Sequence, residues 1–202
     1  MRSRAAAATL SGLGFKAVYS MEGGINAWEG VVAEGAPQSG MAYFSPATKL
    51  EELIALAWFL EDGSRKFYSE LASTLTDNEA RDLYHQLAKA EEHHMASLLE
   101  LYREISGKVP DPGFPGSVIP PGKEGDVMEG GMKVGEALQW TKGKRTTDIL
   151  ELSLSLETNS YDLYLEMGRQ MKDPRSAKVF HVLSGEEKQH LERLSSLFEK
   201  RI

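Results

Sequence analysis

Apolar residues recur at intervals of three and four through four long segments of the chain, which is the spacing of amphipathic helices. The first segment follows Ser45-Pro46, a capping residue and a proline at the first helical position, and predicts a helix over 46–73. The second begins at the capping-box signature Thr76-x-x-Glu79 and extends to about residue 106. The last two helices are predicted over about 147–171 and from Asp173-Pro174 to near the C-terminus. Turn-like stretches inside each pair predict two helical hairpins.

The stretch between the two hairpins has the composition of a loop. Residues 107–132 contain seven glycines and five prolines, and we expect them to form a long crossover from one hairpin to the other. Apolar positions within 133–140 predict one short helix before the second hairpin begins. The pattern therefore predicts a mainly α fold, in which two hairpins form a four-helix bundle.

The two hairpins repeat one another at a fixed offset of 96 residues, and such self-similarity indicates a duplicated structural unit. The matched positions include Glu61 and Glu157, Tyr68 and Tyr164, Asp77 and Asp173, Leu87 and Leu183, Glu91 and Glu187, His94 and His190, and Leu98 and Leu194. Each hairpin thus carries one glutamate on its first helix and one Glu-x-x-His on its second.

Helix geometry brings these residues together. Residues three apart share a helix face, so Glu91 and His94 point the same way. The midpoint between Glu61 and Glu91 is residue 76, within the turn. Folding the hairpin there puts both glutamates about 15 residues from the turn, roughly 22 Å along the axis at 1.5 Å per residue. The second hairpin repeats this geometry around its own turn, so all of these side chains are predicted to meet at one height.

Four glutamates and two histidines at one level of a four-helix bundle are the ligand set of a di-iron or di-manganese carboxylate site. Any single helical glutamate is ordinarily a solvated surface charge. Six such residues at matched heights favour a metal site instead, because an inward-facing charge is costly unless it is paired or binds a metal ion. The predicted ligands are Glu61, Glu91, His94, Glu157, Glu187 and His190.

Two tyrosines lie on the same helix faces as the predicted ligands. Tyr68 and Tyr164 follow the first glutamate of each hairpin by seven residues, which is two helical turns. Each could donate its hydroxyl to a ligating carboxylate, or could simply pack in the core. Four neighbours of the Glu-x-x-His residues fall on other faces and are expected at the surface: Glu92, His93, Glu186 and Lys188.

Composition narrows the class of protein further. The 202 residues are 41% hydrophobic and 26% charged, which suits one or two globular domains with a real core. The net charge of −7 argues against general nucleic-acid binding. The absence of cysteine excludes disulfides, thiol nucleophiles, cysteine-ligated zinc and iron–sulfur centres within this sequence. We find neither a signal peptide nor an apolar run of the ~18 residues that a spanning helix needs, and expect a cytoplasmic protein.

Residues 1–44 differ from the rest and predict a short helix, a short strand and a helical turn, hence a small α/β segment and linker. The segment resembles the C-terminal end of a rhodanese (sulfurtransferase) domain through Arg2-Ser3, Leu10, Gly14-Phe15, Val18-Tyr19, Gly23-Gly24 and Trp28. The resemblance implies a domain fragment, either truncated or kept as a docking element. The alternative is a simple N-terminal arm that packs Trp28 on the bundle. The sulfur-carrying cysteine of that family would precede residue 1, so we expect no sulfur transfer by this chain.

Residues 45–202 resemble the ferritin-like superfamily, and within it the rubrerythrin-like di-iron proteins. The resemblance is carried by Leu87-Ala88-x-x-Glu91-x-x-His94-x-x-x-Leu98, by Leu183-Ser184-x-x-Glu187-x-x-His190-x-x-x-Leu194, and by Glu61-x6-Tyr68 and Glu157-x6-Tyr164. It implies two iron ions (manganese or a mixed pair being alternatives), reaction with hydrogen peroxide or dioxygen, and a homodimer. It also implies the roles of the ligands: Glu91 and Glu187 bridge, His94 and His190 each bind one ion, and Glu61 and Glu157 are terminal.

The sequence departs from the pattern of the peroxide-reducing members of that family at two points. Those proteins carry a second glutamate three residues after the ligand of the third helix, where this chain has Ser160. They also carry a cysteine-ligated rubredoxin domain that supplies electrons, so turnover here would need an external electron donor. Three hypotheses follow: a di-iron oxidoreductase, an iron-binding or storage module without turnover, and a structural or regulatory dimer whose N-terminal segment binds a partner.

Overall fold

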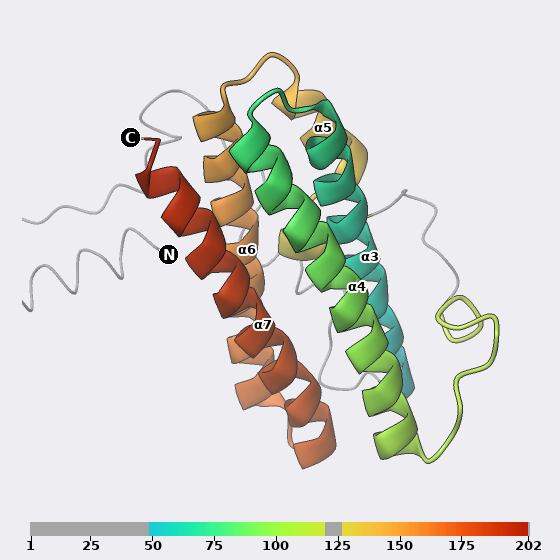
Figure 1. The fold of residues 1–202 in the computed structure, drawn as a ribbon. Coiled ribbons are helices and arrows are strands. Elements are labelled where there is room, and N and C mark those ends of the chain that lie inside the picture. The colour runs from blue at the N-terminus through green and yellow to red at the C-terminus, as the bar shows by residue number, and fades with distance from the viewer. Residues whose placement is uncertain (1–48, 120–126, 202) are drawn as a thin grey trace, which may run out of the picture. The chain divides into compact units, whose positions relative to one another are not determined.

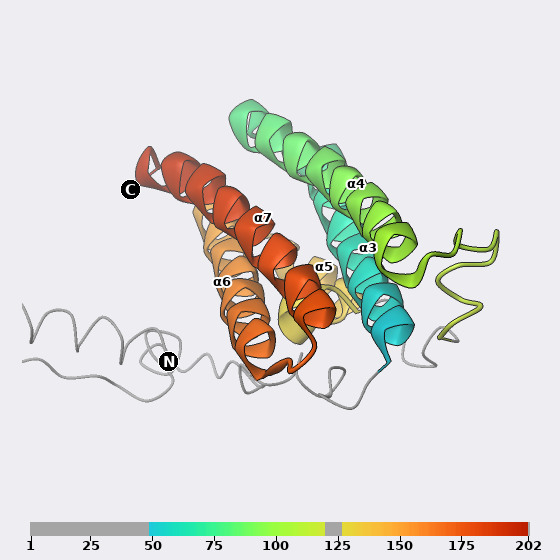
Figure 2. The same cartoon turned by 90° about the horizontal axis from the view of Figure 1, so that it is seen from below.

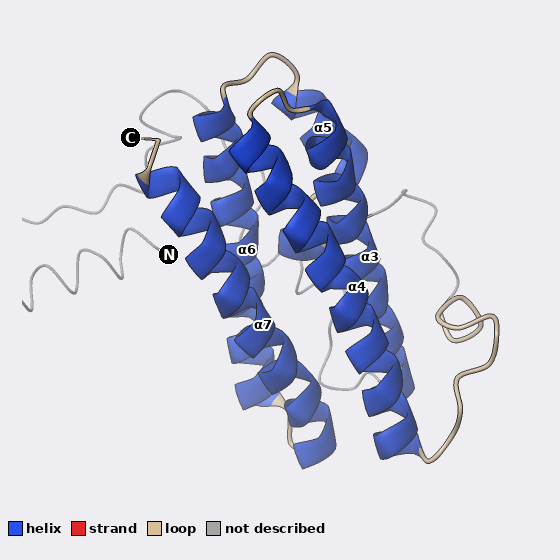
Figure 3. Cartoon of the chain, in the orientation of Figure 1, coloured by secondary structure: helices blue, strands red, loops and turns tan. Residues whose placement is uncertain are grey.

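A computed structural model describes residues 49–119 and 127–201, and the regular secondary structure within these ranges is helical, with one isolated β-bridge and no strand (Figure 3). The long helices are α3 (Leu50–Thr74), α4 (Asn78–Ser106), α6 (Thr146–Gln170) and α7 (Pro174–Glu199). Two short elements lie between the hairpins: the one-turn 3₁₀ helix η2 (Glu129–Gly131) and α5 (Val134–Thr141). The predicted mainly α fold is confirmed for the described residues.

The four long helices form two antiparallel pairs, α3 with α4 and α6 with α7 (Figures 1 and 2). Buried residues from the start of α3 and the end of α4 pack with residues from the end of α6 and the start of α7. Helices α4 and α6 therefore run in the same direction. The end of α4 and the start of α6 thus lie at opposite ends of the bundle, which explains why the chain needs a crossover that travels the length of the bundle.

Local chemistry sets the helix boundaries, with small differences from the prediction. The N-cap of α4 is Asp77, whose side chain accepts a hydrogen bond from the backbone N–H of Ala80, and not the predicted Thr76. Asp173 caps α7 in the same way, with Pro174 at the first helical position. Helix α3 begins at Leu50 rather than at residue 46.

Two apolar clusters fill the bundle on either side of its middle level. The cluster at the end where α3 begins includes Leu53, Ile54, Leu98, Leu101, Met167, Val179 and Phe180. The cluster at the other end includes Phe67, Leu71, Tyr84, Leu87, Met128, Ile149 and Leu197. Burial of this apolar surface is the main stabilising contribution to such a bundle. The level between the two clusters is where the predicted metal ligands lie.

The crossover contacts the bundle through a tight turn over residues 127–133. An antiparallel bridge joins Val127 to Lys133, and the N–H of Met128 donates to the carbonyl of Met132 at 3.0 Å. Gly63 of α3 lies directly beneath this turn, since a Cβ there would be 2.3 Å from the carbonyl oxygen of Val127. The absence of a side chain at Gly63 thus lets the crossover backbone lie against α3.

The predicted rhodanese-like segment and linker over residues 1–44 lie outside the described residues. Helix α5 matches the short helix predicted over 133–140 to within one residue at each end. No helix in the described ranges is both long and apolar enough to cross a membrane.

We predict that Gly63→Ala destabilises the metal-free protein by about 1–3 kcal/mol, because the added methyl group meets backbone atoms that cannot move independently. Gly185→Ala is the matched control. A Cβ at this glycine of α7 would meet nothing within 4 Å, and the substitution should stabilise the helix by about 0.5–1 kcal/mol. Urea denaturation of both variants measures the difference. Equal stability of the two variants would show that the crossover does not pack on α3 as described.

Candidate metal centre

The six predicted ligands lie together at the middle level of the bundle, and all are buried. Glu61 comes from α3, Glu91 and His94 from α4, Glu157 from α6, and Glu187 and His190 from α7. Their exposed fractions are 0% for Glu61, Glu91 and Glu187, 1% for His190, 2% for Glu157 and 7% for His94. Apolar clusters above and below exclude water from this level.

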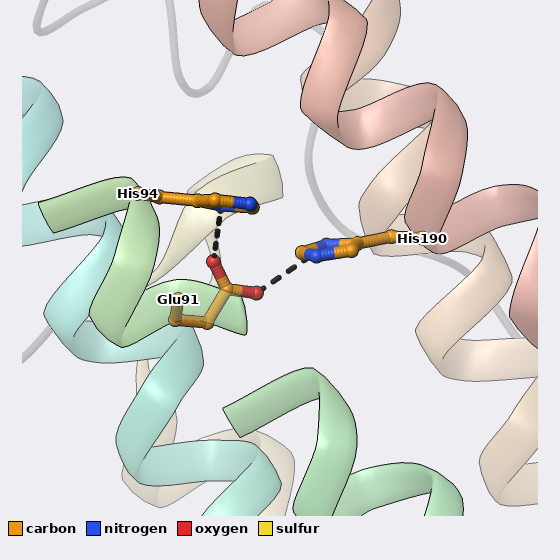
Figure 4. Close-up of side chains that lie close together, drawn as sticks. All are labelled: Glu91, His94 and His190. Atoms are coloured by element: carbon orange, nitrogen blue, oxygen red, sulfur yellow. Dashed lines mark ion pairs between the residues drawn. The ribbon is translucent and has the colours of Figure 1, made fainter. Parts of the chain in front are cut away.

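The two carboxylate oxygens of Glu91 point to different histidines, one to His94 and the other to His190 (Figure 4). His94 Nδ1 is 3.0 Å from Glu91 Oε2, and His190 Nδ1 is 3.4 Å from Glu91 Oε1. The two imidazole rings stack with centroids 4.9 Å apart and an angle of 20° between their planes. Glu91 therefore presents one oxygen to each histidine, which is the arrangement that a bridging carboxylate requires.

Each histidine also contacts the glutamate of the other helix in its own hairpin. His94 Nδ1 lies 3.1 Å from Glu61 Oε2, and His190 Nδ1 lies 3.3 Å from Glu157 Oε2. The sequence repeat is thus present in space as two equivalent Glu–His pairs. The height matching expected from the hairpin geometry is observed in both hairpins.

The two repeated tyrosines both donate hydrogen bonds to buried glutamates. The hydroxyl of Tyr68 donates to Glu157 Oε1, so it reaches from the first hairpin to the second. Its ring is stacked on that of Tyr84, with centroids 5.7 Å apart. Tyr68 therefore combines the two roles that the sequence left open, core packing and orientation of a carboxylate. The hydroxyl of Tyr164 donates at 2.7 Å to Glu129 Oε1.

Glu129 was missed by the sequence reasoning, which assigned its surroundings to a loop. It lies in η2 of the crossover, is 3% exposed, and accepts a second hydrogen bond at 3.1 Å from the hydroxyl of Ser64. A usable signal was present in the sequence: Val127-Met128 is an apolar pair within an otherwise glycine- and proline-rich stretch, and Gly130-Gly131 follows the glutamate directly. An acidic residue between an apolar pair and two glycines fits a turn that inserts into a core.

Three groups of side chains bring three donor atoms within 4.8 Å of one another. They are Glu91 with His94 and His190, Glu157 with Glu187 and His190, and Glu61 with Glu91 and Glu129. Carboxylate oxygens combined with imidazole nitrogens suit iron and manganese ions. The described side chains can therefore hold metal.

Several polar atoms of the predicted ligands are buried and make no hydrogen bond. They are Glu61 Oε1, both carboxylate oxygens of Glu91 and of Glu187, and His190 Nε2. Buried polar atoms are normally satisfied, and a buried carboxylate needs a compensating cation. No lysine or arginine is among the buried residues of the described ranges. The five buried glutamates, Glu129 included, thus outnumber the two imidazoles. Divalent metal ions would supply the missing positive charge.

The buried carboxyl groups of the metal-free protein fall into two sets, one with a raised pKa and one with a lowered pKa. Burial, and then the neighbouring carboxylates, raise the pKa of Glu91, Glu187 and Glu129 well above the usual range. Burial also acts to raise the pKa of Glu157, but His190, followed by the Glu187 carboxyl and the Tyr68 hydroxyl, outweighs it and lowers this pKa to about 2. The contact with His94 likewise outweighs burial and lowers the pKa of Glu61.

The neighbours expected at the surface are exposed, with one exception. Glu92, His93 and Lys188 are exposed, whereas the side chain of Glu186 is only 21% exposed, with Oε2 4.0 Å from His94 Nδ1. Glu186 is thus half-buried rather than fully exposed as predicted, because its carboxylate lies beside His94. Ser160 is buried and donates to the carbonyl of Leu156 at 3.1 Å.

The fold and the buried glutamate–histidine groups define a ferritin-like helical bundle that could bind metal. The sequence profile of the rubrerythrin family matches residues 31–109 and 148–202, and the chain belongs to that family. A solved structure of a hypothetical protein from Pyrococcus furiosus is similar in fold: it is 24% identical with a TM-score of 0.54, and the match covers 82% of this chain and 95% of that one. A search of curated proteins gave no match.

We predict that the metal-free protein melts at lower temperature as pH rises from about 5 to 8. Carboxyls with a raised pKa contribute stability that is complete below the pKa of an unfolded glutamate, about 4.3, and is lost as pH rises through the folded pKa. His94, whose pKa Glu61 raises against the effect of burial, acts in the same direction. The lowered pKa of Glu157 affects stability only in acid, below about pH 4.5.

Added Mn²⁺ should reverse this trend, because metal ligands must be deprotonated and the metal therefore binds more tightly as pH rises. Circular dichroism melts of chelator-treated protein, with and without Mn²⁺, measure both trends. A metal-free melting temperature that rises between pH 5 and 8 would contradict the described charge balance.

Proposed function

We propose that this protein is a di-iron carboxylate oxidoreductase, which reduces hydrogen peroxide or dioxygen by oxidation of bound Fe(II) and is re-reduced by an external electron donor. The observation that supports this most strongly is the convergence of four glutamates and two histidines from four helices, with unsatisfied carboxylate oxygens between them. Membership of the rubrerythrin family supports iron as the metal.

The distances suggest how the residues would share two ions. Glu61 and His94 would bind one ion, and Glu157 and His190 the other, since each pair lies within 3.3 Å. Glu91 would bridge, because its two oxygens face different histidines. Glu187 would bind the ion beside Glu157 and His190, since donor atoms of these three residues lie within 4.8 Å of one another and both Glu187 oxygens are buried without hydrogen bonds. The resemblance to rubrerythrin-like proteins implies these terminal roles and a bridging role for both Glu91 and Glu187.

Reduction of one molecule of hydrogen peroxide to two molecules of water takes two electrons and two protons, and two bound Fe(II) ions would supply the electrons. The side chains of the protein orient the ligands and exclude bulk solvent. Burial favours protonated Glu91 and Glu187 before metal binds, so these groups release protons when it does. The Tyr68 hydroxyl fixes the orientation of Glu157. The apolar clusters above and below keep the level dry, which limits side reactions.

Re-reduction needs a redox group outside these 202 residues, because they contain no cysteine for a rubredoxin-type centre. The tyrosines are the remaining side chains near the site that could exchange an electron. We therefore expect the donor to be a separate redox protein or small reductant, and we expect the bundle to act as a homodimer.

We predict two Fe(II) bound per chain, with about one hydrogen peroxide consumed per two Fe(II) oxidised, at a rate above that of free Fe(II). Glu187→Ala should weaken iron binding by more than about a hundredfold. Even the loss of a residue that only hydrogen-bonds to a metal ligand lowers metal affinity by about 10- to 100-fold. Glu192→Ala, at an exposed position of the same helix, is the control and should bind as the unmodified protein does. Anaerobic titration followed by stopped-flow mixing with peroxide or oxygen measures both quantities.

The competing functions give different results in the same experiment. A storage module would bind many more than two irons per chain and would assemble into a large cage on gel filtration. A structural dimer would bind metal and gain melting temperature, yet oxidise Fe(II) no faster than solution does. Either result would remove the oxidoreductase proposal.

A further inference from the structure

We propose that the crossover supplies a seventh metal ligand, the carboxylate of Glu129, to the ion bound by Glu61 and Glu91. The inference rests on the proposed di-iron site and assigns to it a residue that lies outside the duplicated hairpins. It makes the two metal positions unequal, since the ion beside Glu61 would have one carboxylate more than the ion beside Glu157.

The position of Glu129 is that of a ligand. One of its oxygens lies within 4.8 Å of donor atoms of both Glu61 and Glu91, and the residue is 3% exposed. No lysine or arginine in the described ranges is buried beside it. A carboxylate inserted among four other buried carboxylates is strongly unfavourable unless a cation lies between them.

The backbone around Glu129 is shaped to insert this side chain. Gly130 follows with a φ of 73°, and a Cβ there would be 3.0–3.1 Å from atoms of Leu156 in α6. On the opposite side, Gly63 of α3 leaves room for the backbone at Val127. The turn therefore packs between α3 and α6, with a glycine at each contact. In this position the side chain of Glu129 lies among the predicted metal ligands.

Two hydroxyl groups hold the carboxylate in place. Tyr164 donates to Oε1 at 2.7 Å, and Ser64 donates to Oε2 at 3.1 Å. The backbone N–H of Glu129 in turn donates to the Ser64 hydroxyl at 3.3 Å. Each carboxylate oxygen can accept more than one interaction, so both remain able to bind a cation. Ligating carboxylates are typically oriented by such hydrogen bonds.

A purely structural role for Glu129 explains these contacts less well. A neutral glutamine or a water molecule could accept hydrogen bonds from two hydroxyls without placing a further acidic group among four others. A bound cation, by contrast, would use the negative charge that distinguishes glutamate from glutamine.

The position of Ser160 supports the same inference. Leu156, Ser160 and Tyr164 follow one another at intervals of four along α6 and so share one face. The first contacts Gly130 and the third contacts Glu129, so Ser160 faces the space between them. A large side chain there would compete with η2 for space, and the small serine permits the crossover to deliver the carboxylate instead.

Comparison of the two repeats shows that the contact with Glu129 is made by the serine of the first hairpin and not by the matching serine of the second. Ser64 and Ser160 are matched positions, 96 residues apart. Ser160 donates to the backbone of its own helix, whereas Ser64 donates to Glu129. An otherwise duplicated site is thus made asymmetric by one segment that has no counterpart in the repeat.

The test compares Mn²⁺ binding by the unmodified chain, by Glu129→Gln and by the control Glu136→Gln, an exposed glutamate of α5. Titration calorimetry gives stoichiometry and affinity, and electron paramagnetic resonance reports the coordination of each ion. We expect two Mn²⁺ per unmodified chain. Glu129→Gln should weaken one of the two sites by about tenfold or more and change its resonance signal, while the other site and the control stay unchanged.

A relocation variant makes the test independent of folding defects. Glu129→Ala combined with Ser160→Glu returns a carboxylate to the same space from α6, and should recover the affinity that Glu129→Ala alone loses. A structural role predicts the opposite pattern: Glu129→Gln would lower the metal-free melting temperature and leave both Mn²⁺ affinities unchanged. That result overturns the inference while leaving the two-metal site intact. If the unmodified chain binds no pair of ions, the proposed function fails as well.

Discussion

The structure depends on one electrostatic constraint: five glutamates are buried at the middle of the bundle with two imidazoles and no other cationic side chain among the described buried residues. Such a concentration of acid cannot all be ionised in a dry interior without cations. The metal-free protein responds by protonation, as the raised pKa of Glu91 and Glu187 indicates. Metal ions would replace those protons, so occupancy of the site and stability of the bundle are coupled.

The rest of the fold positions and stabilises the buried glutamates and histidines at the middle of the bundle. Two antiparallel hairpins place their glutamates and histidines at equal distances from their turns. The apolar clusters above and below offset the free energy that burial of these polar groups costs. Contacts also pass between the hairpins at this level. Tyr68 of α3 donates to Glu157 of α6, and Glu91 of α4 lies 3.4 Å from His190 of α7. The polar layer thus specifies how the two halves are registered.

The sequence was sufficient for the features that repetition or periodicity encodes. Apolar spacing predicted the helices of the bundle, and the 96-residue offset predicted which six side chains would meet. Glu129 escaped prediction because it occurs once, in a segment whose glycines and prolines describe a loop, and because its insertion depends on contacts with Gly63 and Leu156 that are remote in sequence. The cap at Asp77 and the partial burial of Glu186 were missed for a similar reason, since exact helix boundaries and the burial of single side chains depend on packing.

The central claim is that two metal ions occupy the space between these carboxylates and imidazoles. Anomalous diffraction across the iron and manganese edges, from crystals of protein purified without chelator, tests it most directly. We predict two peaks at the middle level of the bundle, one bonded to Glu61 and His94 and the other to Glu157 and His190, with Glu91 bonded to both. Crystals without a peak at this level, or with the carboxylates turned out to solvent, would contradict the account.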